Sequence, residues 1–276
     1  MKKMTTSFIL LNLAVLGISA CSSNNRDTGV AKAMMNSAHA QASKPHVDYR
    51  PIRAVPTAAR NAVIMAYEAR HSRQWEQLPA YAELAKEDHE LGAYPMYWYW
   101  RQQLQDTRLP IDHAGVQQFI RQHPNTYVAE RLQAEWQVAS ARRGEYGIVQ
   151  QQGITSLNLS APKCAYYQAS AATGTKLNKQ QVLEDFRPNT SCWDMLRTLQ
   201  ARGQLSFTDL QGPLRDAVEY DNKGNARQYA SLVFDAHQMR DYDAIIANPS
   251  AWIASQVGAA THPMQAELRA LAFSRL

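Results

Sequence analysis

Apolar side chains recur every three or four positions from Thr57 onward, and no stretch alternates between apolar and polar residues. The first segment carries Val63, Ala66 and Tyr67 on this spacing, which is the period of one face of an α-helix. Ala, Gln, Leu, Arg and Glu recur throughout and favour helices, whereas the whole chain holds only 12 glycines. The pattern predicts an all-α fold over residues 57–276.

Signals for helix starts and ends follow one another at short intervals. Side chains that cap helices predict the starts, and prolines and a glycine predict the ends. The predicted boundary residues are Asp112, Pro124 with Asn125 or Thr126, Gly174, Pro188 with Thr190 or Ser191, Ser206 or Thr208, Asn222, and Asn248 or Ser250. They indicate roughly a dozen helices of about 10–17 residues with short joints, typical of antiparallel helix pairs. Because no repeat of about 34 residues is readable, we expect an irregular α-solenoid and not a tetratricopeptide array.

Residues 1–20 are predicted to be a targeting segment outside the fold. Lys2 and Lys3 form a positive start, and a mostly apolar run follows as far as Ile18. This run is shorter than the roughly 20 residues of a membrane-spanning helix and fits a signal peptide. Residues 18–21, Ile-Ser-Ala-Cys, resemble the lipobox of bacterial lipoproteins. An ordinary secretory signal followed by a chance cysteine is the alternative.

The lipobox resemblance implies cleavage before Cys21 and attachment of a lipid to its thiol. Ser22 follows the cysteine, where an aspartate would indicate retention in the inner membrane. We therefore expect a periplasmic lipoprotein that is anchored to the outer membrane through Cys21. Residues 21–56 are rich in Ser, Asn, Ala and Gln, with prolines toward the end, and this composition predicts a flexible tether.

Two cysteines remain once Cys21 is assigned to a lipid. Cys164 and Cys192 form an even pair, and an oxidising compartment such as the periplasm favours a disulfide between them. A zinc site is the alternative, although neither cysteine has CxxC spacing or a nearby histidine. The sequence therefore favours a disulfide.

Residues 94–104 hold the densest motif of the chain, Tyr-Pro-Met-Tyr-Trp-Tyr-Trp-Arg-Gln-Gln-Leu. Pro95 fits the first turn of a helix, where its missing N–H has no cost. Aromatic residues then surround the predicted helix on every side, which favours burial between neighbouring helices. The functional alternative is that these aromatic rings are stacking platforms for sugars.

The same motif resembles a stretch of the soluble lytic murein transglycosylases, and further resemblances follow in the order of that family. The matching segments are residues 94–104, 119–124, 131–146, 164–167, 191–196 and 248–273. Together they extend over the predicted folded region, residues 57–276. The resemblance implies a U-shaped superhelix of antiparallel helix pairs that guides or binds the glycan strands of peptidoglycan.

In that family a lysozyme-like catalytic domain follows the superhelix. It cleaves the bond between N-acetylmuramic acid and N-acetylglucosamine and leaves a 1,6-anhydro end, with one glutamate acting first as acid and then as base. The Glu-Ser motif of this domain is missing, because none of the 11 glutamates precedes a serine. We therefore assign no catalytic residue. We expect residues 57–276 to be an incomplete superhelical domain without the catalytic domain.

The sequence carries no motif for a metal site, a phosphate-binding loop or a serine nucleophile. HExxH, a glycine-rich phosphate loop and G-x-S-x-G are all missing, so we expect no metal and no cofactor. Residues 87–90, Glu-Asp-His-Glu, are interpreted as a solvated charge run. The net charge of +5 is not gathered in a basic stripe, which argues against nucleic-acid binding. The remaining alternative is a lipid-anchored helical scaffold for a periplasmic protein partner.

Overall fold

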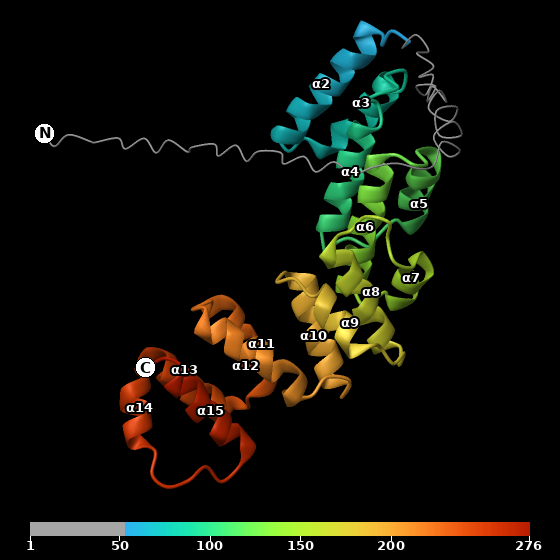
Figure 1. Cartoon of the computed structure of the whole chain (residues 1–276). Helices are drawn as coiled ribbons and strands as arrows, with labels where there is room; N and C mark the ends of the chain where they lie inside the picture. The colour runs from blue at the N-terminus through green and yellow to red at the C-terminus, as the bar shows by residue number, and fades with distance from the viewer. Residues whose placement is uncertain (1–52) are drawn as a thin grey trace, which may run out of the picture. The chain divides into compact units, whose positions relative to one another are not determined.

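Fourteen α-helices follow one another through the part of the chain that the computed structural model describes, residues 53–276 (Figure 1). They are α2 (Thr57–His71), α3 (Leu78–Ala85), α4 (Tyr94–Gln105), α5 (His113–Gln122), α6 (Tyr127–Arg142), α7 (Tyr146–Gln152), α8 (Ser160–Ala172), α9 (Lys179–Asp185), α10 (Thr190–Ala201), α11 (Phe207–Glu219), α12 (Lys223–Val233), α13 (Ala236–Ala247), α14 (Pro249–Ser255) and α15 (Pro263–Phe273). A short 3-10 turn, Trp75–Gln77, precedes α3, and no strand occurs in this part. The all-α fold class is confirmed.

Part of the predicted organisation lies outside the described residues. This applies to the signal peptide (residues 1–20), to the lipidation site Cys21 and to the tether as far as residue 52. The fourteen helices belong to one compact unit, residues 54–276. Within residues 53–276, no helix is both long enough and apolar enough to cross a membrane.

Capping side chains define most of the helix starts. The Asp112 carboxylate accepts a hydrogen bond from Gly115 N at 2.9 Å, and Thr126 Oγ1 accepts one from Ala129 N at 3.3 Å, as the sequence predicted. Such bonds satisfy the backbone N–H groups that have no partner inside the first turn. The predicted cap of α10 was wrong, because Asn189 caps this helix and not Thr190 or Ser191.

The helices also differ from the expected lengths. Four of them have only 7 or 8 residues: α3, α7, α9 and α14. Short helices bury little surface alone and depend on their neighbours for stability. The sequence pattern of about 10–17 residues per helix therefore merged short elements that the structure separates.

Each helix packs mainly on the next helix in the chain and on the next but one. The alternate helices α2, α4, α6, α8, α10 and α12 form a continuous series of contacts, and α13 packs on α15 in the same way. Packing between near neighbours in the sequence is the hallmark of solenoid proteins, in which each unit contacts only the adjacent units. The superhelical path and the U shape remain predictions.

The hydrophobic core is divided among several clusters along the chain. The largest surrounds the two cysteines and extends from α8 to α15. A second joins α4, α5 and α6, and smaller clusters lie between α6, α7 and α8 and between α2, α3 and α4. The local helix contacts explain this division, because most helices pack only on helices that are near in the sequence.

Two buried carboxylates connect segments that are distant in the sequence. Arg60 of α2 binds Asp88 in the joint before α4, with Nε 2.5 Å from Oδ2. Arg215 of α11 donates two hydrogen bonds to Glu267 of α15, whose side chain is only 1% exposed. Asp88 is therefore not part of a solvated charge run as predicted, although Glu87, His89 and Glu90 are exposed. Burial raises the pKa of Asp88, but the hydrogen bonds from Arg60 and the backbone outweigh burial and lower it.

Gly92, in the joint before α4, has no room for a side chain. A methyl group there would collide with the carbonyl oxygens of Ala85 and Asp88, which are backbone atoms and cannot turn away. We expect Gly92→Ala to lower the free energy of unfolding by about 1–3 kcal/mol, as overpacking usually does. Thermal unfolding should register the change as a melting temperature lower by several degrees.

Gly212→Ala is the matched control, because Gly212 lies within α11 and its new methyl group would meet no atom within 4 Å. Alanine is the better helix former, so this variant should gain about 0.5–1 kcal/mol. Equal melting temperatures for the two variants would contradict the close packing around Gly92.

The Asp209 carboxyl makes the free energy of unfolding depend on pH. Its carboxylate accepts hydrogen bonds from Lys179 Nζ at 2.8 Å and from Ser206 N at 2.7 Å. Burial raises the pKa of Asp209, but these bonds outweigh burial and lower it to about 2. Because the folded-state pKa is depressed, the stabilisation is complete above pH 4 and disappears as the pH falls toward 2.

Asp209→Asn should therefore cost about 1–2 kcal/mol at pH 6, after allowance for the solvent around Lys179, and much less at pH 2, where about half of the Asp209 carboxyl is protonated. Urea unfolding at both pH values measures the difference. Glu219→Gln, at the end of the same helix and without an ion pair among residues 53–276, is the control. A loss that is the same at pH 6 and pH 2 would refute this assignment.

Candidate functional site

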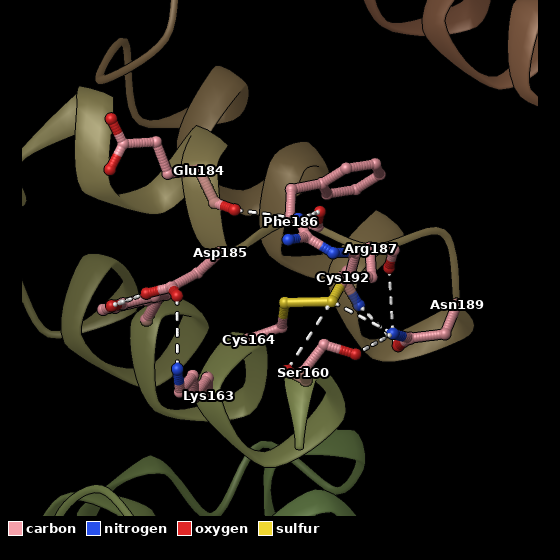
Figure 2. Close-up of a disulfide and its surroundings, with 10 residues drawn as sticks. Ser160, Lys163, Cys164, Glu184, Asp185, Phe186, Arg187, Asn189 and Cys192 are labelled. Atoms are coloured by element: carbon pink, nitrogen blue, oxygen red, sulfur yellow. Dashed lines mark hydrogen bonds and ion pairs between the residues drawn. A yellow bond between two sulfur atoms is a disulfide. The ribbon is translucent and has the colours of Figure 1, made fainter. Parts of the chain in front are cut away.

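A disulfide joins α8 to α10 (Figure 2). The sulfur atoms of Cys164 and Cys192 are at bonding distance, 2.06 Å apart, and both side chains are completely buried. The predicted cysteine pair is confirmed at this distance, and the zinc alternative is thereby removed. Because no solvent reaches the sulfurs, the bond is a structural link and not an exposed redox group.

Polar contacts on two sides of the disulfide hold the adjoining segments in place. Asn189 Nδ2 donates a hydrogen bond to Ser160 Oγ at 3.1 Å, which connects the starts of α10 and α8 (Figure 2). Lys163 Nζ and Tyr167 Oη both donate to Asp185 at the end of α9. Burial, followed by the bond to Asp185, raises the pKa of Tyr167 to about 12. The disulfide thus lies within a fixed junction of three helices.

The aromatic helix α4 is only partly buried. Tyr97 is buried, whereas Tyr94, Trp98, Tyr99 and Trp100 each keep part of their surface exposed. All five aromatic residues of α4 are buried or partly buried, and Gln105 is the only residue of the helix that is exposed. The expected burial between neighbouring helices is therefore confirmed in part: α4 packs on α2, α3 and α6 and shares a hydrophobic cluster with α5, but four of its rings keep some accessible surface.

An aromatic cluster forms where α4 meets α2; we use this name for Tyr67, His71, Tyr94 and Trp98. The ring centres of Tyr67 and Trp98 are 6.1 Å apart, and those of Tyr67 and His71 are 4.1 Å apart. Tyr94 is 5.8 Å from Trp98, and the Arg70 guanidinium lies 5.4 Å from the Trp98 ring centre. Half of the Tyr67 surface is exposed. Exposed ring faces of this kind can stack on another flat apolar surface.

A cavity of about 410 Å³ lies between α4, α6 and the start of α8. We call it the central cavity. Arg101, Arg131 and Arg142 line it together with Glu135, beside an apolar wall. The Glu135 Oε1 atom lies 3.0 Å from Arg131 Nε and 3.3 Å from Arg101 Nε. The cavity lining therefore carries more positive than negative charge.

A second cavity, of about 500 Å³, lies between α5, α6 and α7. We call it the amide-lined cavity, because Gln117, Gln133, Gln151 and Gln152 all contribute to its wall. Trp136 also lines it, and its indole N–H donates to His113 Nδ1 at 2.9 Å. Both amide atoms of Gln152 are buried without a partner. Such a wall offers uncharged donors and acceptors, which suit a neutral polar ligand.

The chemistry available in these cavities is binding. Glu135 is the only carboxylate that lines the central cavity, where it is ion-paired with Arg131 and Arg101, and no carboxylate lines the amide-lined cavity. Within residues 53–276, no three His, Cys, Asp or Glu side chains are grouped so that they could hold a metal ion. We assign no catalytic role to any residue of either cavity.

Sequence reasoning found only some of the residues in these sites. It singled out the α4 aromatics and, through the family resemblance, Arg131 and Trp136. It missed Tyr67 and His71, although their spacing of four residues places them on one face of a helix. It also missed Glu135 and the glutamines, because no local pattern reveals which helices will enclose a cavity.

Comparison with protein-family models, characterised proteins and solved structures finds no match to this chain. The resemblance to lytic transglycosylases therefore stays a prediction that rests on the sequence motifs.

The disulfide should contribute measurably to stability. Cys164 and Cys192 are 28 positions apart, and closing a loop of this size reduces the entropy of the unfolded chain by an equivalent of about 3–4 kcal/mol. We expect reductant to lower the midpoint of urea unfolding accordingly. The double variant Cys164→Ala, Cys192→Ala should unfold at the lower midpoint with and without reductant. If full reduction left the urea midpoint of the native chain unchanged, the disulfide would add no stability.

Proposed function

We propose that residues 57–276 form the helical, non-catalytic part of a peptidoglycan lytic transglycosylase and bind glycan strands. The family's catalytic domain would then cleave the strand. Support comes from the ordered sequence resemblances, from the all-α fold with neighbour-to-neighbour packing, and from the bonded cysteine pair at the two cysteine segments. We further propose that Cys21 carries a lipid, which would hold the domain in the periplasm at the outer membrane.

The observation that carries this proposal is the partly exposed aromatic cluster. Sugar rings present apolar C–H faces that pack on aromatic rings, while their hydroxyls require hydrogen-bond partners. Tyr67, which is half exposed and lies beside the partly buried Trp98, offers the first kind of surface. The amide-lined cavity, about 500 Å³ in volume, offers the second. A helical domain with both kinds of surface can hold an uncharged carbohydrate without catalytic groups.

A scaffold that binds a periplasmic protein is the second candidate. Ile64 and Met65 on α2 and Leu84 on α3 are apolar and at least about half exposed, and α2 packs on α3. Exposed apolar side chains on adjacent helices can form the centre of a protein interface. Met65→Glu with Leu84→Glu should abolish capture of a protein partner and leave glycan binding intact, which separates the two functions.

Glycan binding can be tested by co-sedimentation of the purified chain with insoluble peptidoglycan. Tyr67→Ala removes a half-exposed ring from the aromatic cluster and should weaken binding about five- to tenfold. Tyr220→Ala is the matched control, because the Tyr220 side chain is 81% exposed but lies at the end of α11, outside the cluster. If the native chain stays in the supernatant, or if both variants bind equally, the proposal fails.

A further inference from the structure

We propose that the central cavity binds a small organic carboxylate with a hydrogen-bond donor beside it, the chemistry of an N-acylated amino acid. This inference is independent of glycan binding. The central cavity shares no residue with the aromatic cluster or with the amide-lined cavity. It rests on the charges, the unpaired polar atoms and the apolar wall that meet in this one space.

The charge of the cavity points to an anionic ligand. Arg101 and Arg131 both approach the same oxygen, Glu135 Oε1, so this one carboxylate is shared between two guanidinium groups. Arg142 also lines the cavity and has no ion-pair partner among residues 53–276. Arginine binds carboxylates through two parallel hydrogen bonds. A ligand carboxylate would supply the partner that Arg142 lacks.

The start of α8 adds to this preference for an anion. Ser160, Ala161 and Pro162 line the cavity, and no side chain caps the helix, because its N-cap residue is Leu159. The first N–H groups of a helix have no partner inside the helix, and its N-terminal end carries partial positive charge. The uncapped end of α8 and Arg142 thus face the same space from two helices.

Glu135 explains why the ligand should also carry a donor. Tyr97 Oη donates to Glu135 Oε1 at 3.5 Å and Arg131 Nε donates to it at 3.0 Å, while Arg101 forms an ion pair with the same oxygen. Burial, and then the charge of Glu135, raises the pKa of Tyr97, which keeps its hydroxyl protonated as a donor. The other oxygen, Oε2, is buried without a partner, which is costly unless a ligand provides one. An amide N–H beside the ligand carboxylate would fill this role.

The remaining wall sets the size of the ligand. Leu104, Val138 and Pro162 contribute apolar surface, and the cavity volume is about 410 Å³. This favours a compact ligand with a short apolar group. N-acetylalanine has all three features, and N-acetylalaninamide differs from it only in the missing charge.

The test uses the full chain, purified in detergent, and saturation-transfer NMR titrations with these two compounds. N-acetylalanine should bind, and the neutral amide should bind at least about tenfold more weakly, because it lacks the charge-assisted bond. Inorganic phosphate should displace N-acetylalanine only at far higher concentration. Equal binding of acid and amide, or displacement by equimolar phosphate, would overturn the proposal.

Two variants assign the binding to this cavity. Arg142→Gln should weaken N-acetylalanine binding about tenfold or more. Arg202→Gln, which removes an exposed arginine from the end of α10 instead of the end of α6, should leave it unchanged. Both sites are exposed, so circular dichroism should find both variants folded. Equal affinities for the two variants would place the ligand elsewhere.

Glu135→Gln gives the opposite effect and distinguishes a binding site from a structural ion cluster. The substitution releases Arg101 and Arg131 to the ligand but keeps an oxygen that can accept the ligand N–H. The affinity for N-acetylalanine should therefore rise several-fold, while that for the neutral amide should not. Unchanged or weaker binding of N-acetylalanine by the folded variant would refute the assigned role of Glu135.

Discussion

The fold depends on one helix that is buried on two sides. Ala165 and Ala169 of α8 pack toward α6 and α7, whereas Cys164, Tyr167 and Ala171 belong to the large core shared with α10. A helix in this position needs small side chains, because its neighbours approach closely on both sides. α8 holds five alanines, and three of them, Ala165, Ala169 and Ala171, are buried. The disulfide then adds a covalent link to α10, with the two cysteine Cα atoms 4.9 Å apart.

Packing between near neighbours also explains where the cavities occur. In a globular core, side chains from many distant segments fill the same interior, but here most interfaces are made by helices that are adjacent or next but one in chain order. Where three such helices meet, their side chains do not close the space between them. The central cavity lies at the meeting point of α4, α6 and α8, and the amide-lined cavity lies where α5, α6 and α7 meet. Helix α6 takes part in both, which explains why its surface carries so many of the candidate binding residues.

Local chemistry could be predicted from the sequence, and long-range placement could not. The caps at Asp112, Asn222 and Asn248 were recognisable because one side chain and a nearby N–H suffice to define them. The cap of α10 was misplaced by one or two residues because Asn189, Thr190 and Ser191 all have suitable side chains. The choice depends on Asn189 also reaching Ser160, which is 29 positions away. Asp88 was misjudged for the same reason, since its partner Arg60 is 28 positions away.

The disulfide and the central cavity share structural elements. Asn189 lines the cavity, caps α10 and donates to Ser160, which itself lines the cavity at the start of α8. Cys192 lies three positions after Asn189, and its backbone N–H donates to the Asn189 side chain. The covalent link between α8 and α10 therefore also fixes one rim of the cavity. A ligand that binds only the folded rim would stabilise the same junction, so the disulfide and the ligand would act on one structural element, the packing of α8 against α10.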